Sequence, residues 1–438
     1  MNTEKIKSVK RDSKSIILTL LSTCFIFFSA DSSYAVSSPP QKEPEKIPDY
    51  FPQIPSFEVV KKLVPVLEKG SVVIIQREKG KPPFITGIVL INAPLEKVFS
   101  VVRELEKYHE FVPNVSKVRV VEKVDENTEN VEYNLAFDVA LGIKFKISYT
   151  LEEKNDSKNY IRYGIPAKKG EQAFRDVRFI EKFFSLEDGR TIMIYSAYAD
   201  LASFGTLSKL VFRAFPELQI PALVAVSTLF PEAVKERIEK KKIIVEPKEV
   251  NYNLLKAPER LDINSLLPIL RLYRNIIISW YPDESGVRFF SSFVLLKKDT
   301  DYIKSQITNF SEWPKVFKIV EEAIPETIRN GYRVKFKVKY KVVFPIELEY
   351  SSIYLWDEKG ERLTCQIDRT QKRDIEGSIC SWDFYNTNYG TVIGYSEFSD
   401  LRTGSYFLKL LMDKVPGFGI GLRVALVSAY SELMKEKL

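Results

Sequence analysis

Apolar and polar residues alternate along much of the chain with the period of two that is typical of strands. β-Branched and aromatic residues are enriched in these segments, and turn-forming stretches such as Glu187, Asp188 and Gly189 separate them. In the first half the pattern predicts strands at residues 84–90, 117–124, 132–139, 144–151, 159–163, 176–184 and 191–198. In the second half it predicts strands at residues 287–295, 334–343, 348–355, 362–367, 378–384 and 391–398.

Helical spacing of apolar residues occurs at corresponding places in the two halves. A leading helix and a short helix after the first strand are predicted in each half, at residues 57–67, 94–105, 263–272 and 299–307. Each half closes with a long amphipathic helix, at residues 222–240 and 422–437. A helix of this length can cover the face that a sheet must bury.

The two halves are copies of one unit. Residues 190–238 align without a gap with residues 390–438, at an offset of 200, and 14 of these 49 positions are identical. The pattern Tyr-Ser-x-x-x-Asp-Leu, for example, begins at Tyr195 and again at Tyr395. Unrelated segments rarely align this well without a gap, so we expect a tandem repeat.

This order of elements predicts an α+β fold with two tandem domains. Each domain is expected to be an antiparallel curved sheet wrapped on a long C-terminal helix. We place the first domain at residues 56–241 and the second at residues 263–438, joined by a linker at residues 242–262. A Pro-rich polar linker at residues 36–55 precedes the first domain.

Two motifs carry a resemblance to a known family. Residues 91–94 (Ile-Asn-Ala-Pro) join an apolar strand to an amphipathic helix, which is similar to the opening of the START-like, or SRPBCC, superfamily. Residues 108–113 resemble the aromatic-x-x-aromatic-x-Pro turn of its polyketide cyclase and coenzyme Q-binding branches. The second copy departs from both motifs, because Asp299 replaces the Ala-Pro opening and Pro314 directly follows Trp313.

The resemblance implies a helix-grip fold in both copies. Members of the superfamily hold a hydrophobic molecule, such as a lipid, an isoprenoid or a polyketide, between the sheet and the C-terminal helix. A fold shared by so many ligands does not identify one of them.

Residues 1–35 have the features of a secretory signal peptide. A basic start precedes an apolar stretch of 13 residues at 16–28, and Ser33, Tyr34 and Ala35 provide the small residues that a signal peptidase needs. A lipoprotein signal at Cys24 and an uncleaved anchor are the alternatives. We therefore expect an exported protein, periplasmic or secreted.

The pattern of charged residues along the chain indicates which kinds of binding partner to expect. The net charge is +7, but acidic and basic residues are interspersed without a basic stripe, so nucleic acid is not an expected partner. A peripheral contact with an anionic membrane surface stays open.

Cys365 and Cys380 are the cysteines that remain after removal of a signal peptide. They lie in consecutive predicted strands, so a hairpin can bring the two sulfurs to the same side, and an oxidising compartment would favour a disulfide. Two small buried apolar side chains are the alternative.

Few residues suggest catalysis. His109 is the single histidine, and the second copy has Ser311 at this position, so a surface role is favoured over that of a general base. One histidine cannot build a His/Cys metal cluster, and the glycines lack the spacing of a phosphate-binding loop. We expect no catalytic residue, no metal and no cofactor.

Phe111 and Trp313 are candidate ligand-binding residues. Both lie in the helical turn that, in START-like proteins, rims the mouth of the cavity. Contact with a ligand or a membrane is one interpretation, and a packing anchor is the other.

The last strand of each copy supplies the remaining candidates. Glu397 is expected to face water, so the residues that alternate with it should point inward. The inward candidates for ligand binding are Ile192, Ile194, Ser196, Tyr198, Val392, Ser396 and Phe398. Plain core packing is the alternative for all of them.

Three functions remain open at this point. The first is an exported binding protein or carrier for a hydrophobic small molecule. The second is an enzyme similar to cyclases and aromatases that uses the same cavity. The third is an interaction module of the cell envelope without a small ligand. The oligomeric state is open as well.

Overall fold

The computed structural model describes residues 48–437, apart from residues 78–81, 140–142, 204–218, 245–249, 283, 318, 342–344, 401, 404–408, 410–411 and 413–417. The predicted signal peptide at residues 1–35 and most of the predicted linker at residues 36–55 lie outside the described residues.

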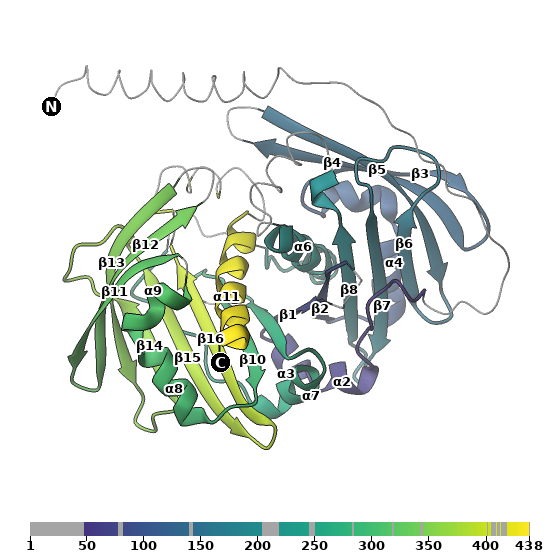
Figure 1. The fold of residues 1–438 in the computed structure, drawn as a ribbon. Helices are drawn as coiled ribbons and strands as arrows, with labels where there is room; N and C mark the ends of the chain where they lie inside the picture. Colours follow the sequence, from purple (N-terminus) through teal and green to yellow (C-terminus); the bar gives the residue numbers. More distant parts are fainter. Residues whose placement is uncertain are drawn as a thin grey trace, which may run out of the picture.

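Two units follow each other in the chain and lie side by side (Figure 1). The first contains α2 (Phe57–Lys61), α3 (Val64–Leu67), β1 (Gly70–Gln76), β2 (Phe84–Ile91), α4 (Leu95–Arg103), η1 (Leu105–Glu110), β3 (Val115–Lys123), β4 (Thr128–Val139), β5 (Ile143–Asp156), β6 (Ile161–Pro166), β7 (Val177–Ser185), β8 (Thr191–Ala199), η3 (Leu201–Ser203) and α6 (Gln219–Glu239).

The second unit repeats this order. It contains α7 (Ile263–Tyr273), β9 (Asn275–Trp280), β10 (Phe290–Leu296), α8 (Thr300–Thr308), η5 (Phe310–Glu312), α9 (Trp313–Val316), β11 (Val320–Ile328), β12 (Gly331–Lys341), β13 (Pro345–Trp356), β14 (Arg362–Ile367), β15 (Ser378–Thr387), β16 (Gly390–Ser399) and α11 (Phe418–Lys437).

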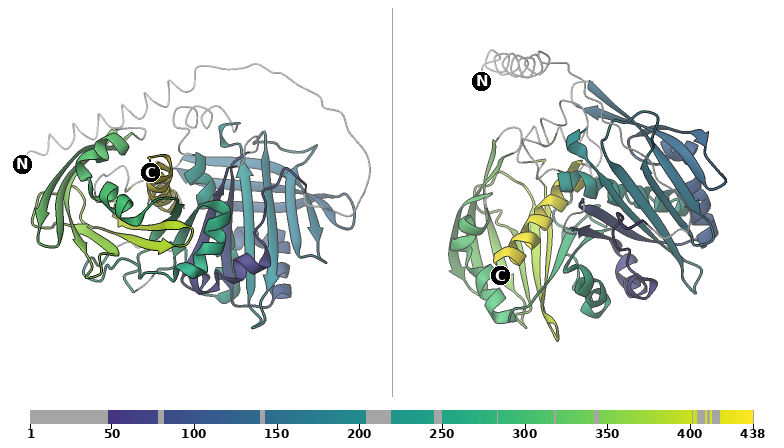
Figure 2. Two further views of the ribbon diagram at one scale, coloured as in Figure 1. Left: turned by 60° about the horizontal axis from the view of Figure 1, so that its bottom comes forward. Right: turned by 45° about the vertical axis from the view of Figure 1, so that its right-hand side comes forward.

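The predicted fold class is confirmed. Each unit is α+β, and its antiparallel strands curve around its long C-terminal helix, as the yellow helix α11 shows in both views of Figure 2. All thirteen predicted strands are present, although their bounds differ by several residues at some ends. Strands β1, β9 and β11 were not predicted.

Within the described residues, sixteen strands form one continuous sheet that runs through both units. The units are joined by β1 and β9, which pair antiparallel, with Val72 opposite Ile278. Gly70 permits this close pairing, since a Cβ atom there would lie 2.4 Å from the carbonyl oxygen of Ser279. The two predicted domains are therefore joined through paired strands, one from each domain.

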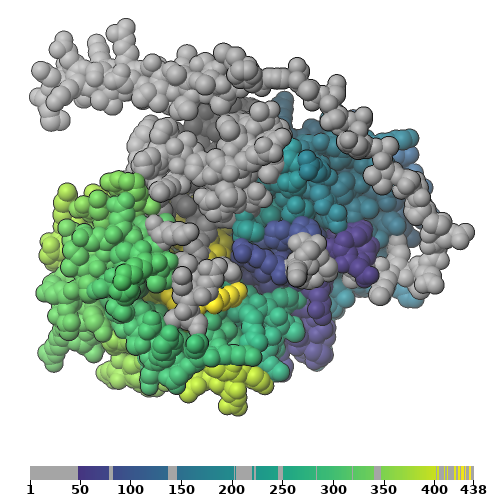
Figure 3. Space-filling model, in the orientation of Figure 1, coloured from purple at the N-terminus to yellow at the C-terminus, as the bar shows by residue number. Residues whose placement is uncertain are grey.

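Helices α6 and α11 pack on one face of the sheet and against each other. Helix α6 crosses β2 closely at Gly87, where a Cβ atom would meet the carbonyl oxygen of Ser227 on α6. Helices α2, α3 and α7 pack together, and α3 and α7 lie on the central strands. Figure 3 shows these purple and green segments in contact at the junction of the units.

A separate apolar cluster lies under these three short helices. It includes Val60, Leu67 and Leu266 from the helices and Ile194 and Phe398 from the last strands of the two units. The central part of the sheet is therefore covered on both faces.

A buried ion pair links the two units. Arg288, which precedes β10, donates through Nη1 to Oε2 of Glu232 on α6 at 2.8 Å, and both side chains are 1% exposed or less. The hydroxyl of Ser71 on β1 donates to the other carboxylate oxygen at 2.6 Å. The second terminal nitrogen of Arg288 donates to the carbonyl of Ile243. This network ties α6 to β1 of the first unit and to the segment that precedes β10 in the second unit.

We predict that Arg288→Met lowers the free energy of unfolding by about 3–5 kcal/mol, because it leaves the carboxylate of Glu232 buried without a cation. The double variant Arg288→Met/Glu232→Leu should recover much of this loss, since it removes both charges. Urea unfolding of the single and double variants measures the effect.

The exposed pair of Lys61 and Glu187 provides the control, and Glu187→Ala should change stability far less. Equal losses in Arg288→Met and Glu187→Ala would contradict a buried link between the units.

Candidate functional site

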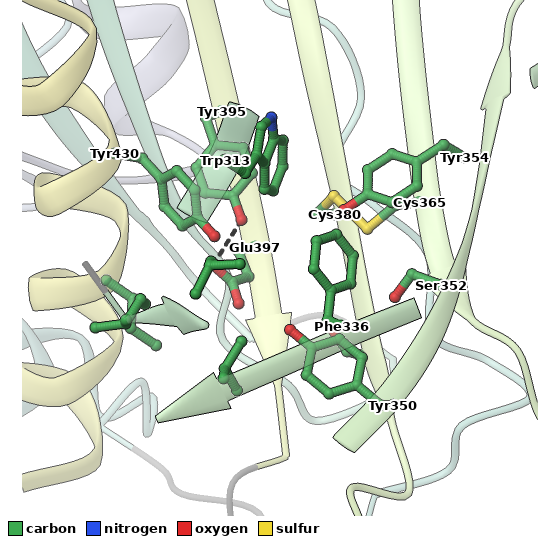
Figure 4. Close-up of a pocket in the computed structure, with 15 residues that line it drawn as sticks. Trp313, Phe336, Tyr350, Ser352, Tyr354, Cys365, Cys380, Tyr395, Glu397 and Tyr430 are labelled. Atoms are coloured by element: carbon green, nitrogen blue, oxygen red, sulfur yellow. Dashed lines mark hydrogen bonds between the residues drawn. A yellow bond between two sulfur atoms is a disulfide. The ribbon is translucent and has the colours of Figure 1, made fainter. Parts of the chain in front are cut away.

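The second unit encloses a small cavity between its sheet and α11. Its volume is about 30 Å³. The described residues that line it come from α9, the turn before β11, the six strands β11 to β16 and α11, and they are Trp313, Ile319, Val320, Phe336, Val338, Tyr350, Ser352, Tyr354, Cys365, Ser378, Cys380, Tyr395, Glu397, Leu426 and Tyr430. Figure 4 shows that the side chains of Tyr395, Tyr430, Phe336 and Tyr350 converge on this space.

One carboxylate, that of Glu397, lines the cavity. The phenol of Tyr395 donates to its Oε2 at 2.7 Å, and the hydroxyl of Ser399 donates to its Oε1 at 2.8 Å. Burial raises the pKa of Glu397, while the two hydrogen bonds act in the opposite direction. The carboxylate is thus held in a fixed position at the wall of the cavity.

Aromatic rings form most of the wall. Tyr395 and Tyr430 lie 4.5 Å apart between their ring centres, which brings the last strand and α11 together. The indole nitrogen of Trp313 donates to the carbonyl of Ile307 at 3.0 Å, so this ring is held in place by α8. Trp313 also contacts Phe336 and Tyr354, at 5.6 Å and 6.4 Å between ring centres.

Cys365 on β14 and Cys380 on β15 are directly paired across the two strands. Their sulfurs form a disulfide, with 4.9 Å between the Cα atoms. Both residues line the cavity, so the disulfide is part of its wall.

The interior of the first unit contains a buried cluster of charges instead. Arg162 on β6 contacts Glu181 on β7 at 3.0 Å and Glu153 on β5 at 3.7 Å, and all three side chains are 2% exposed or less. The phenol of Tyr133 donates to Glu153. The guanidinium also lies over the ring of Phe179, 5.0 Å from its centre. These groups fill the space with interactions among themselves.

Two carboxylates share a single guanidinium in this cluster. Burial raises the pKa of Glu181 to about 7 and also raises the pKa of Glu153, whereas Arg162 acts in the opposite direction on both. We therefore expect one proton to remain on the pair near neutral pH.

The predicted orientation of the last strands is wrong. Gly87 faces α6, and it pairs with Tyr195 across the strands, so Tyr195 also faces α6 and the residues on either side of it face away. In the second unit Tyr395 contacts Tyr430 of α11, which reverses the assignment there as well. Glu397 misled the assignment, because its half-buried side chain lines the cavity beside α11.

The residues assigned to the interior accordingly lie on the opposite face of the sheet. Ile192, Ile194, Val392 and Phe398 belong to the apolar cluster under α2, α3 and α7.

The polar and aromatic members of that set also have partners there. The hydroxyl of Ser196 bonds to that of Thr86 at 2.6 Å, and the hydroxyl of Ser396 bonds to that of Ser291 at 2.6 Å. Tyr198 packs against Phe84 in a separate small cluster. These hydrogen bonds, between β2 and β8 and between β10 and β16, satisfy the hydroxyl groups of both serines without a ligand.

The two turn residues have different roles. Trp313 is buried and is the predicted ligand residue that occurs among the described residues lining the cavity. Phe111 is half-buried, packs against Tyr108, and lies under the guanidinium of Arg237. His109 is exposed, and its Nδ1 lies 2.7 Å from the carbonyl oxygen of Glu106.

Sequence reasoning missed most of the cavity wall, including Glu397, Tyr430, Tyr350, Tyr354 and Phe336. One signal was available. Glu397 and Tyr395 lie on the same side of β16, and the other side of this strand is apolar as well. The carboxylate of Glu397 therefore did not identify which side of the strand faces solvent.

No group of three His, Cys, Asp or Glu residues that could hold a metal ion occurs in the described part of the chain. The cavity can therefore offer apolar and aromatic contacts, hydroxyl groups and one carboxylate.

Residues 91–240 match the family model described as polyketide cyclase / dehydrase and lipid transport. The match runs from the end of β2 through α6 and so covers most of the first unit. It confirms the predicted resemblance to the START-like superfamily for this unit, and the second unit repeats its order of elements. No curated protein sequence matches the chain.

Solved structures with a similar fold share little sequence with this chain. The di-domain ARO/CYC StfQ from the steffimycin biosynthetic pathway is 12% identical and covers 80% of this chain and 95% of its own, with a TM-score of 0.29. A STAR-related lipid transfer protein from Xanthomonas axonopodis is 14% identical over 39% of this chain and 94% of its own, with a TM-score of 0.29. Human STARD10 is 14% identical over 43% of this chain and 83% of its own, with a TM-score of 0.30.

We predict that Glu181→Gln changes the pH dependence of stability. The unfolded chain releases the proton of Glu181 near pH 4.5, whereas the folded protein holds it up to about pH 7. The associated stability is complete below pH 4.5 and is lost as the pH rises through 7. Between pH 5 and 8 the wild type should lose on the order of 2–3 kcal/mol relative to Glu181→Gln.

Urea unfolding followed by circular dichroism at several pH values tests this prediction. Glu106→Gln, which alters an exposed carboxylate, should keep the wild-type pH dependence. Parallel pH profiles of wild type and Glu181→Gln would contradict the raised pKa.

Proposed function

We propose that the protein is an exported binding protein for a hydrophobic small molecule, which the second unit holds between its sheet and α11. The observation that carries the proposal is the cavity, whose described wall includes aromatic rings and the fixed carboxylate of Glu397. The match of the first unit to a family described by lipid transport supports the same class of ligand.

The size of the cavity sets a condition on this proposal. Ligand pockets usually have a volume of about 300–1,000 Å³, and the cavity here has about 30 Å³. Binding of a complete hydrophobic molecule therefore requires α11 to move away from the sheet. The described structure represents the closed form under this proposal.

The units differ in their suitability for a ligand. In the first unit Arg162, Glu153 and Glu181 interact with one another and occupy the interior. Removal of Arg162 would leave two buried carboxylates without a cation. We therefore assign the ligand to the second unit and a structural role to the first.

A ligand-free interaction module is the second candidate function. The filled interior of the first unit and the small size of the cavity favour it. A cyclase-like enzyme has less support, because the cavity presents one acid, Glu397, among the described lining residues.

Export is the remaining part of the proposal. Residues 1–35 have the pattern of a signal peptide, and a disulfide between Cys365 and Cys380 is typical of an oxidising compartment. Among the described helices, none is long and apolar enough to span a membrane.

We predict that the purified protein binds the neutral dye Nile red and that Leu426→Phe weakens this binding about tenfold or more, since the larger side chain fills the cavity. The matched control is Val226→Phe at the equivalent position of α6, which is 52% exposed and should bind as the wild type does. Fluorescence titration measures both.

Failure of the wild type to bind Nile red, together with no lipid in extracts of the protein, would favour the ligand-free module. Equal weakening by Leu426→Phe and Val226→Phe would contradict the assignment to the second unit.

We predict that the mature protein begins at Val36 and contains the disulfide. Intact-mass spectrometry of protein isolated from the producing cells should show the loss of residues 1–35 and a gain of two hydrogen atoms on reduction. A chain that retains Met1, or a lipid-modified chain that begins at Cys24, would contradict cleavage after Ala35.

A further inference from the structure

The cavity of the second unit contains a carboxylate without a cationic partner. Glu397 is the one acidic residue among the described lining residues, and they include no lysine, arginine or histidine. Its hydrogen-bond partners are the hydroxyl groups of Tyr395 and Ser399, which are neutral. Each carboxylate oxygen keeps a lone pair that can accept a further hydrogen bond.

The guanidinium of the first unit has no counterpart in the second unit. Arg162, Glu181 and Tyr195 lie in one row across β6, β7 and β8. The same row in the second unit is Leu363, Trp382 and Tyr395 across β14, β15 and β16. The first unit thus provides a guanidinium for its buried carboxylates, and the second unit has an apolar side chain instead.

Glu397 is half-buried, and withdrawal of a carboxylate from water is costly unless a positive charge or a proton accompanies it. The cavity wall is suited to a positive charge, because the faces of aromatic rings attract cations. Tyr395 and Tyr430 lie beside Glu397, and Phe336, Tyr350 and Tyr354 lie across the cavity (Figure 4). The negative charge of Glu397 and the aromatic wall of the cavity therefore both favour a cation as the occupant.

The volume restricts the occupant further. The cavity volume is about 30 Å³, which favours a compact group such as a primary ammonium group. A trimethylammonium group is considerably larger. The cavity therefore selects a compact cation that can donate hydrogen bonds to Glu397.

We propose that this cavity binds the primary ammonium group of an otherwise apolar molecule, with Glu397 as the counter-ion and the aromatic rings as the surrounding wall. The assignment rests on the proposed function, of which it specifies the ligand class. The apolar part of the ligand lies between the sheet and α11 when the unit opens.

Isothermal titration calorimetry with hexylammonium and with hexanol tests the proposal, because the two ligands share their chain and differ in the head group. The wild type should bind hexylammonium about tenfold or more tightly than hexanol. Glu397→Gln should lose this preference and still bind hexanol and Nile red. Glu358→Gln, which changes an exposed carboxylate of the same unit, should keep the wild-type preference.

Several outcomes overturn the ammonium site. Equal binding of hexylammonium and hexanol by the wild type does so while the proposed function stands, since an apolar ligand is still bound. A preference for hexylammonium that survives Glu397→Gln removes the role of that carboxylate. Binding of hexyltrimethylammonium as tightly as hexylammonium contradicts the restriction to a primary ammonium group.

Absence of binding by hexylammonium, hexanol and Nile red overturns the ammonium site and the proposed function together. Circular dichroism of Glu397→Gln confirms that a loss is not due to unfolding. Competition by lysophosphatidylethanolamine distinguishes a lipid head group from a free amine, and either result agrees with the ammonium site once the hexylammonium preference is established.

Discussion

The pairing of β1 with β9 is the constraint on which the remaining architecture depends. It joins the two units into one sheet, and it brings α6 and α11 onto the same face, where they pack against each other. Arg288 and Glu232 form their ion pair in this region, buried from water. Each unit therefore buries its first strands against the other unit as well as within itself, and neither unit has a free edge at the junction.

Within this common frame the two interiors have different contents. The first is filled by Arg162 and the two carboxylates that share it, whereas the second keeps a small cavity with Glu397 at its wall. The two interiors differ at one row of paired strand positions, where Arg162 of the first unit corresponds to Leu363 of the second. Duplication of one fold has thus produced one unit whose buried charges pair with one another and one whose carboxylate has no cationic side chain among the described lining residues.

The sequence allowed the secondary structure and the repeat to be predicted, but not the faces of the strands. Strands β2 and β10 are buried on both sides, and β8 and β16 are largely so, because α6 or α11 covers one face and the short helices cover the other. Alternation of side chains identifies two faces, and it cannot tell which of two buried faces meets the long helix. Strands β1 and β9 were missed for a related reason, since their centres are unbroken apolar runs, at residues 72–75 and 276–278, which have no alternation to detect.

The sequence by itself determined the tandem α+β organisation, the long closing helices and the positions of Cys365 and Cys380 on consecutive strands. These features follow from periodicity and from the repeat, which are local properties of the chain. The tertiary structure decided that the units share a sheet, that Tyr395 and Glu397 face α11, and that one interior holds a cluster of paired charges while the other holds a small cavity. These outcomes depend on contacts between residues far apart in the sequence, where packing volume and the pairing of buried charges select the arrangement.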